Sequence, residues 1–124
     1  MLVFVYGTLM KGEANNRLLK TSERMGTEIV SGFTMVSLGA YPACISDETS
    51  TTSVLGEVWK IDTETFQRLD RLEGYPHFYD RKEVDTFAGK AWIYFMPKEK
   101  RNEELYEKIQ SGSWKQYLSE RKKK

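Results

Sequence analysis

Short runs of residues that favour β-structure, separated by glycines and polar turns, constrain this chain more than any other feature. The first run, Leu2–Tyr6, is continuously apolar and ends at Gly7, which is typical of a buried strand. About six strands mixed irregularly with helices predict an α+β fold built on a strongly curved sheet or small barrel. The remaining strands are expected at 29–30, 33–38 and 54–61, with a hairpin over 79–87 and 91–96 that turns near Ala88-Gly89.

One helix has clear signals at both ends. Asp62 is a good N-cap, the apolar spacing continues through Glu73, and Gly74 stands where a helix often ends. Weaker patterns predict helices over 13–23, 101–109 and 113–120, and the polar stretch 46–53 is expected to be a loop. A length of 124 residues suits a single domain, 1–124, with a core over about 1–97, a helical C-terminal segment, 98–120, and a frayed basic tail, 121–124.

Composition excludes several classes of protein. Sixteen aromatic residues argue against disorder, and no apolar run approaches the ~20 residues that span a bilayer, so no membrane association is expected. A single cysteine, Cys44, predicts a reducing, cytoplasmic location. Four of the 19 Lys and Arg residues lie in 121–124, so the rest of the chain, with 15 basic against 18 acidic residues, has a net charge of −3. We therefore expect no nucleic-acid partner.

Three common chemistries lack the residues that they require. His77 is the only histidine, so no metal site is expected. No local sequence supports a Cys44–His77 nucleophile pair, and an inert buried thiol is the usual state of such a cysteine. Gly7 and Gly12 have the spacing of a phosphate loop, but Glu13 follows where that loop needs lysine.

The turn Tyr6-Gly7-Thr8-Leu9 joins the first strand to the next segment and has two interpretations. Several backbone N–H groups in one bend could form a concave site for a carboxylate. The alternative is an ordinary turn in which glycine only supplies a positive φ, and the residues alone favour that alternative.

Glu73 is the strongest candidate for chemistry. A helical projection places it in the apolar stripe between Phe66 and Leu69, with Arg71 on the opposite side. Apolar surroundings and a helix C-terminus both raise the pKa of a carboxyl group, which suits it to general acid–base catalysis. The alternatives are a partly exposed glutamate or one that pairs with Arg81.

Other polar residues on the expected strands are more ambiguous. Glu57 shares a face with Trp59 and could point inward, although a bond to a tyrosine or arginine is the interpretation we favour. Tyr79 and Tyr94 could offer hydroxyls to a pocket, or could be buried with their hydroxyls satisfied elsewhere.

Taken together, these residues resemble the γ-glutamylcyclotransferase-like family, in its AIG2-like or γ-glutamylamine cyclotransferase branch. A Tyr-Gly-Thr-Leu turn alone is a weak signal, but its combination with Leu-Asp-x-Leu-Glu-Gly-Tyr-Pro further on is specific. The resemblance covers about residues 3 to 96, and its motifs are 5–9 with Gly12 and Asn15, 41–43, 56–58, 69–76, 79–81 and 91–94.

The resemblance implies a small mixed β-barrel with flanking helices and a pocket for a γ-glutamyl group. It also implies that the backbone amides of Tyr6, Gly7, Thr8 and Leu9 hold the substrate α-carboxylate and that Glu73 is catalytic. The implied reaction closes 5-oxoproline by attack of the α-amino group on the γ-carbonyl, without metal or cofactor. Which amine or amino acid leaves stays open.

Two alternatives from other classes remain. One is a module of the same fold that binds a γ-glutamyl compound or 5-oxoproline without turnover, which a salt bridge between Glu73 and Arg81 would favour. The other is a protein that binds a partner through its basic tail, 121–124, which rests on those four residues alone.

Overall fold

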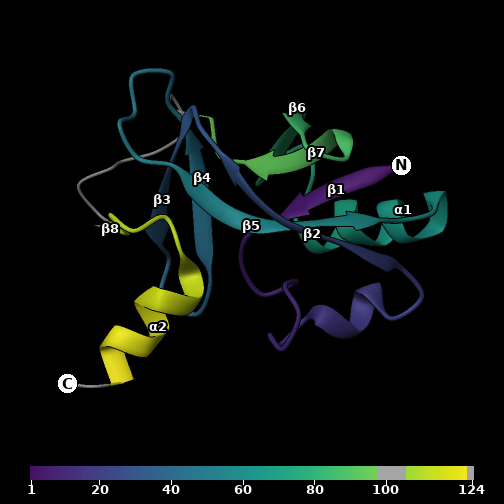
Figure 1. Ribbon diagram of the computed structural model, residues 1–124, viewed down its shortest axis with the longest axis horizontal. Helices are drawn as coiled ribbons and strands as arrows, with labels where there is room; N and C mark the ends of the chain where they lie inside the picture. The colour runs from purple at the N-terminus through teal and green to yellow at the C-terminus, as the bar shows by residue number, and fades with distance from the viewer. Residues whose placement is uncertain (98–105, 123–124) are drawn as a thin grey trace.

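Two β-sheets form the centre of the fold in the computed structural model, which describes residues 1–97 and 106–122 (Figure 1). The larger sheet has five strands in the order β2-β5-β1-β7-β6. Its strands are β1 (Leu2–Val5), β2 (Glu23–Val30), β5 (Val54–Lys60), β6 (Asp80–Thr86) and β7 (Gly89–Phe95). The smaller sheet has the order β4-β3-β8, with β3 (Phe33–Ser37), β4 (Pro42–Ser46) and β8 (Glu107–Lys108).

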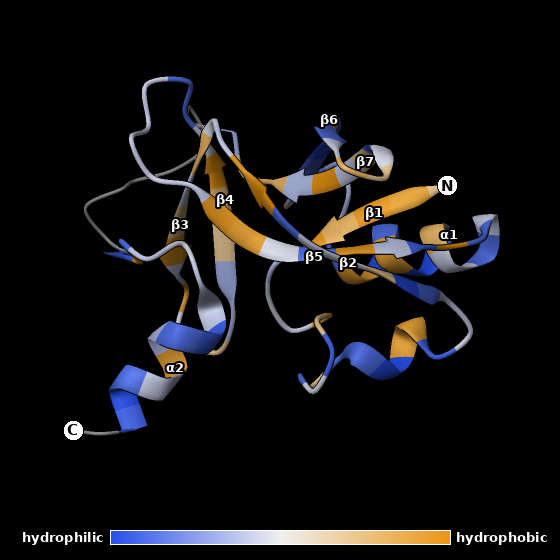
Figure 2. Cartoon of the chain, viewed as in Figure 1, coloured by the Kyte–Doolittle hydropathy of each residue, from blue (hydrophilic) through white to orange (hydrophobic). Residues whose placement is uncertain are grey.

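Three helical segments accompany the sheets. The α-helix α1 (Thr63–Leu72) follows β5, and a short 3₁₀ helix, η1 (Asn16–Leu19), precedes β2. The second α-helix, α2 (Trp114–Lys122), lies beside the smaller sheet at the opposite end of the molecule from α1 (Figure 1). Figure 2 shows hydrophilic residues over much of α2 and a hydrophobic β1 at the centre of the larger sheet.

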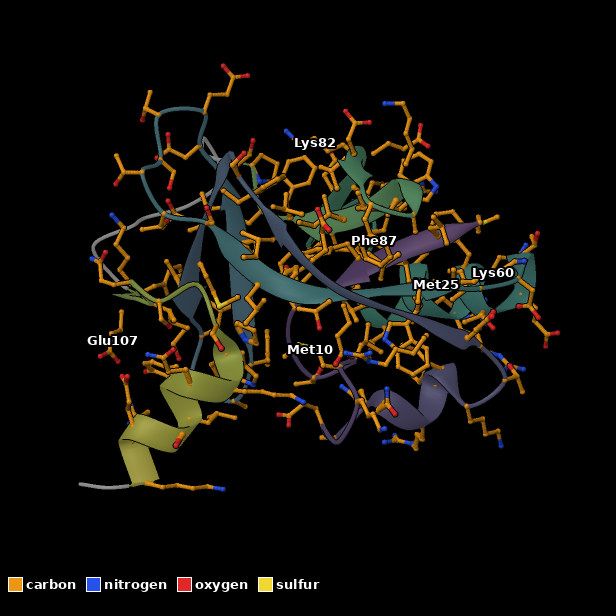
Figure 3. All side chains as sticks on the ribbon, in the orientation of Figure 1. Met10, Met25, Lys60, Lys82, Phe87 and Glu107 are labelled. Atoms are coloured by element: carbon orange, nitrogen blue, oxygen red, sulfur yellow. The ribbon has the colours of Figure 1, made fainter. Side chains whose placement is uncertain are left out.

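The larger sheet is mixed, because β1 pairs in parallel with β7 and antiparallel with β5. This confirms the α+β class and the mixed sheet. A single bridge between Ile45 and Met96 connects the two sheets, and no closed barrel forms among the described residues. The edge strands of the larger sheet nevertheless approach each other, since the Phe87 ring lies against Gly26 of β2; Figure 3 labels Phe87. The sheet is therefore strongly curved rather than closed.

The hydrophobic core surrounds β1. Val3, Phe4 and Val5 are each at most 3% exposed because β1 is a central strand with both neighbours in place. The continuous apolar run at the start of the sequence therefore predicted this strand correctly. Its last residue leads directly into the turn at Tyr6–Leu9, so a buried central strand supports that turn.

The local signals for α1 are also confirmed. Asp62 Oδ1 accepts a hydrogen bond from the Thr65 N–H at 2.8 Å, and this bond lowers the Asp62 pKa. The helix ends at Leu72 with Glu73 as its C-cap, and Gly74 follows with φ of +65°, a conformation that a side chain would disfavour. These two ends fix which residues face the interior at the last turn.

Two predictions between residues 13 and 46 are wrong. The helix expected over 13–23 is reduced to the four residues of η1, because the chain folds into consecutive turns with backbone bonds, and the Asn15 and Asn16 side chains donate to the preceding turn. The strand β4 was missed: it begins at a proline, and its pairing with β3 depends on the chain reversing at Gly39.

The C-terminal predictions have mixed outcomes. The helix expected over 113–120 is present and continues through Lys122, so Arg121 and Lys122 are helical rather than frayed. Within the helix expected over 101–109, residues 107–108 form a strand that pairs with β3, while 101–105 lie outside the described residues. No helix in 1–97 or 106–122 is long and apolar enough to span a membrane.

Candidate active site

A pocket of about 490 Å³ opens between the turn that follows β1, the end of α1 and the start of β4. This volume is within the range of about 300–1,000 Å³ that is typical of small-molecule sites. All seven residues singled out from the sequence line it, namely Tyr6, Gly7, Thr8, Leu9, Glu73, Tyr79 and Tyr94. Segments far apart in the sequence thus converge on one cavity.

The turn after β1 depends on close packing at Gly7. A Cβ atom there would lie 2.7 Å from Cγ of Pro42, which is too close for any side chain. Gly7 is absent from the glycines with positive φ, so the expectation that it serves to supply such a φ is wrong. Within the described residues, the amides of Gly7, Thr8 and Leu9 donate no hydrogen bond to a protein acceptor. The turn thus presents three neighbouring free donors at the pocket wall.

Two asparagines that sequence reasoning did not assign to the site hold this turn in place. Asn15 donates from its side chain to Thr8 Oγ1 at 2.9 Å, and its backbone N–H donates to the Thr8 carbonyl at 2.8 Å. The Asn16 side chain donates to the Leu9 carbonyl at 2.8 Å. These bonds occupy carbonyls and a hydroxyl of the turn and leave its amides free. The adjacent pair of asparagines was the available signal, because asparagine often bonds to nearby backbone.

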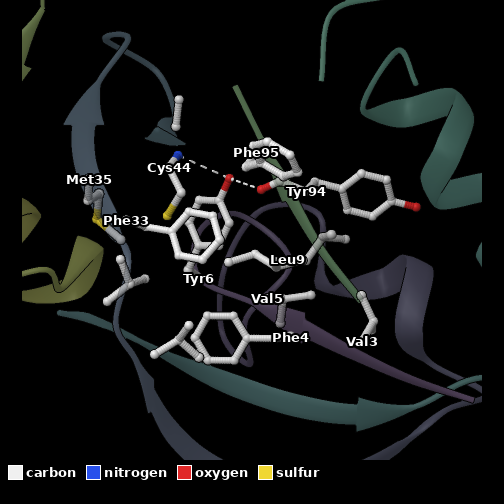
Figure 4. Packing of buried hydrophobic residues seen from close by; sticks show 14 of the residues in the cluster. Val3, Phe4, Val5, Tyr6, Leu9, Phe33, Met35, Cys44, Tyr94 and Phe95 are labelled. Carbon is white, nitrogen blue, oxygen red and sulfur yellow. Dashed lines mark hydrogen bonds between the residues drawn. The ribbon is translucent and has the colours of Figure 1, made fainter. Parts of the chain in front are cut away.

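The Tyr6 side chain has a structural role in this arrangement. Its hydroxyl donates to the Tyr94 carbonyl at 2.8 Å and accepts from the Cys44 N–H at 3.2 Å (Figure 4). Burial raises the pKa of the Tyr6 hydroxyl well above its usual value, so it stays protonated. The Tyr6 hydroxyl therefore connects the end of β1 to both β4 and β7.

Glu73 is the carboxylate of the pocket. It follows the last turn of α1, where the fully buried Leu69 lies one helical turn away, and burial raises its pKa from 4.5 to about 7. Across residues 1–97 and 106–122, no basic group pairs with the Glu73 carboxylate and none donates a hydrogen bond to it. A carboxylate with this pKa can exchange protons near neutral pH in either direction.

The proposed alternative pairing between Glu73 and Arg81 is not found. Arg81 instead binds Asp70, with Nε 2.9 Å from Oδ1 and Nη2 3.3 Å from Oδ2. Its guanidinium also lies between 4.1 and 4.6 Å from the ring centres of Tyr75, Phe66 and Trp92. Asp70 and the aromatic rings thus engage this cation, and Glu73 is left without a counter-ion.

The hydroxyl groups of both candidate tyrosines donate hydrogen bonds within the protein. The Tyr94 hydroxyl donates to Asp70 Oδ1 at 2.7 Å, and the Tyr79 hydroxyl donates to the Pro42 carbonyl at 3.3 Å. Burial raises the pKa of both phenols, so both stay neutral. Figure 4 shows the Tyr94 ring extending away from Tyr6. Each oxygen keeps lone pairs with which it can accept a further hydrogen bond.

Glu57 has the structural role that we favoured. It is 6% exposed and accepts hydrogen bonds from the Lys11 N–H at 2.8 Å and Trp59 Nε1 at 3.1 Å, while Arg24 lies 3.3 Å away. Three donors satisfy this carboxylate, and it does not line the pocket.

The remaining candidates lie apart from the site. Cys44 is fully buried, which raises its thiol pKa, and His77 is exposed, so the two form no nucleophile pair. No group of three or more His, Cys, Asp and Glu side chains is arranged to hold a metal in the part of the chain that the structure describes. Arg71, expected on the side of α1 away from Glu73, lines the same pocket, because the pocket surrounds the open end of the helix.

Several known proteins are similar to this chain. Residues 3–116 match the family model described as "Gamma-glutamyl cyclotransferase, AIG2-like". A Vibrio cholerae protein named "Putative gamma-glutamylcyclotransferase" is 40% identical over 114 residues, which are 91% of this chain and 94% of that protein. The gamma-glutamylcyclotransferase family protein YtfP of Escherichia coli is 31% identical over 92% of this chain and 96% of its own length.

Solved structures share the fold. An uncharacterized protein of Pyrococcus horikoshii superposes with a TM-score of 0.81 and 26% identity, covering 98% of this chain and 95% of that one. The solution structure of YtfP superposes with a TM-score of 0.73 over 92% of this chain and 96% of its own.

Proposed function

The chain belongs to the γ-glutamyl cyclotransferase, AIG2-like family, and from that premise we propose that it releases 5-oxoproline from a γ-glutamyl amine or γ-glutamyl amino acid. The observation that carries the proposal is the unpaired Glu73 carboxylate, with a pKa of about 7, in the same pocket as three free backbone amides. A proton acceptor and an anion site are the two groups that this cyclisation requires of a protein.

The free amides of Gly7, Thr8 and Leu9 are proposed to bind the α-carboxylate of the substrate. Backbone N–H groups that converge in one bend attract an anion without any basic side chain. The buried strand β1 and the hydrogen bonds from the Asn15 and Asn16 side chains fix the direction of these amides before the substrate arrives. Held at this end, the γ-glutamyl chain can fold so that its α-nitrogen approaches its own γ-carbonyl, and such intramolecular positioning supplies much of a rate enhancement.

Glu73 is proposed to act first as base and then as acid. As a carboxylate it takes a proton from the α-ammonium, and the freed amine attacks the γ-carbonyl to form the ring C–N bond. The protonated Glu73 then delivers that proton to the departing nitrogen as the original amide C–N bond breaks. Glu73 is thereby returned to its carboxylate form. It then takes the second proton from the ring nitrogen and passes it to the released amine, so the products are 5-oxoproline and an ammonium ion.

Tyr79 and Tyr94 are proposed to orient the α-nitrogen. Because their protons go to Pro42 and Asp70, their oxygens act as acceptors toward the pocket. An acceptor pair of this kind suits an ammonium group better than a developing oxyanion, for which a donor is needed. No metal or cofactor takes part in the proposed steps.

The test is 5-oxoproline release from a panel of γ-glutamyl amines and γ-glutamyl amino acids, with Glu73→Gln measured alongside the native chain. We expect turnover by the native chain and a loss of about 10²- to 10⁴-fold in the variant, the usual size of a general acid–base contribution. Binding of 5-oxoproline, measured by calorimetry, should persist in the variant. Saturable binding without turnover on any panel member would instead support the binding module.

The chemistry of the chain also bears on where it works and what it binds. The buried free thiol of Cys44 supports our proposal of a reducing, cytoplasmic compartment. The net charge of −3 outside 121–124 gives no electrostatic support for a nucleic-acid partner.

A further inference from the structure

Arg71 differs from the other arginines that the structure describes. Five of them bind a carboxylate or a carbonyl: Arg17 binds Ala14, Arg24 binds Glu57, Arg68 binds Glu64, Arg81 binds Asp70 and Arg121 binds Glu107. Across residues 1–97 and 106–122, Arg71 is the one arginine whose side chain has no hydrogen bond and no ion pair. Among the same described residues, it is also the only basic one that lines the pocket.

The pocket mouth has a second unusual property. Tyr41, Leu72 and Phe78 all line it, and they expose 41%, 43% and 46% of their surface. Exposed large apolar side chains that cluster around a concave site are typical of ligand contacts. The rim of this pocket therefore combines an apolar surface with one unpaired guanidinium.

The sequence order relates this rim to the proposed reaction. Glu73 protonates the departing nitrogen, so the leaving group lies beside the end of α1. Arg71 and Leu72 immediately precede Glu73, and Phe78 is tied to the same end by a bond from its N–H to the Gly74 carbonyl at 2.8 Å. In the proposed function, the amides of the turn after β1 bind the α-carboxylate of the γ-glutamyl group. The Arg71 guanidinium, on the side of the leaving group, is therefore available to a different anion.

We infer that Arg71 is a specificity-determining residue that binds a carboxylate on the leaving group. This inference rests on the proposed cyclotransferase function. In an amino acid the carboxylate is separated from the departing nitrogen by a single carbon, which places it near Glu73 and within reach of the last turn of α1. Guanidinium is the cation that best matches a carboxylate. The preferred substrates are therefore γ-glutamyl amino acids with an apolar side chain, and leaving groups that carry a positive charge are disfavoured.

An exposed arginine at a helix C-terminus has a simpler explanation. A basic residue in the last turn interacts favourably with the helix dipole, and that role needs no ligand. The two roles predict different results, because the dipole interaction affects the stability of the chain and not its choice of substrate.

The experiment compares γ-glutamyl-phenylalanine with its C-terminal amide, which has nearly the same shape and keeps the γ-glutamyl α-carboxylate but has no carboxylate on the leaving group. For the native chain we expect KM for the acid to be about tenfold lower than for the amide, with similar kcat, because an interaction equal in ground and transition states changes KM alone. Arg71→Gln should raise KM for the acid about tenfold and remove most of the difference between the two compounds. Arg71→Lys should keep part of the preference, since it keeps the charge.

Arg68→Gln is the matched control. Arg68 lies on the same helix, is exposed, and pairs with Glu64 at 2.6 Å outside the pocket, so its loss should leave both KM values unchanged. Equal KM values for acid and amide in the native chain, or a preference that survives in Arg71→Gln, would overturn the inference and leave the cyclotransferase standing. Failure to release 5-oxoproline from either compound, or from the wider panel, would overturn the proposed function and this inference with it.

Discussion

Asp70 and Glu73 lie one helical turn apart at the end of α1, and Arg81 pairs with Asp70 rather than with Glu73. The same Asp70 carboxylate also accepts a hydrogen bond from the Tyr94 hydroxyl at 2.7 Å. Asp70 thus binds both Arg81 and Tyr94, and Glu73 is left unpaired beside the pocket. The two carboxylates differ in their partners, and burial without a counter-ion disfavours the ionised form of Glu73 and raises its pKa.

The pH dependence of turnover should report Glu73. The proposed base is active only when ionised, and burial raises its pKa to about 7. We expect kcat/KM to rise about tenfold per pH unit below pH 7 and to level off above it, until loss of the substrate ammonium proton lowers it again. A pH–rate profile with an apparent pKa near 4.5 would contradict this assignment.

The stability of the chain should also depend on Glu73. Its pKa is higher in the folded state than in the unfolded state, so the unfolded chain loses this proton first as pH rises from about 4.5 to 7. The free energy of unfolding should therefore fall through that window, and the ionised group should cost about 3 kcal/mol above it. Glu73→Gln should be more stable than the native chain at pH 8 by about that amount and equal to it at pH 4, as measured by urea unfolding.

Glu64→Gln provides the control for that measurement. Glu64 lies on the same helix, is exposed, and pairs only with Arg68. Its substitution should change stability by less than about 1 kcal/mol at either pH. If the two variants respond alike at pH 8, the burial of Glu73 is not the cause.

Asp70→Asn should weaken both the fold and the site. The substitution leaves Arg81, which is half-buried against three aromatic rings, without its counter-ion, and it changes the acceptor of the Tyr94 proton. We expect a loss of about 1–3 kcal/mol in unfolding free energy. Asp85→Asn, which breaks the exposed pair with Lys90, should lose less than about 1 kcal/mol in the same assay.

Gly7→Ala should damage the anion-binding turn. The new methyl group would lie 2.7 Å from Pro42 Cγ, so either the turn or the start of β4 must move. We expect a loss of about 1–3 kcal/mol in stability and a marked fall in affinity for 5-oxoproline. Pro42→Ala should relieve the clash, so the double variant should be more stable than the sum of the two single changes predicts. Additive losses would show that the contact is not the cause.

How much of the fold the sequence predicts depends on how local the signal is. The helix α1 is predicted together with both of its ends because Asp62 and Gly74 act on their immediate neighbours. The strand β4 is not predicted, since its first residue is a proline and its pairing with β3 depends on the chain reversal at Gly39, which no pattern of alternating residues indicates. The same limit explains η1, where Asn16 bonds to the turn instead of extending a helix.

The candidate site shows a similar division. Helical periodicity placed Glu73 among apolar neighbours, and the resemblance to a family picked out the turn at Tyr6–Leu9; both line one pocket, although their roles remain predictions. Neither helical periodicity nor the family resemblance indicates that Gly7 packs against Pro42 or that Asp70 pairs with Arg81. Both contacts join different elements of the fold, so no local pattern in the sequence reveals them.

The bonds of the Tyr6 hydroxyl to the Cys44 N–H and the Tyr94 carbonyl also have a consequence for motion. The wall of the pocket formed by the end of β1 cannot swing outward unless both bonds break, and both bonds lie where the two sheets meet, beside the bridge between Ile45 and Met96. Amide hydrogen exchange at Cys44 should accordingly be among the slowest in the chain and should proceed only through cooperative opening. A binding wall that is already immobile has little conformational entropy left to lose when a ligand arrives.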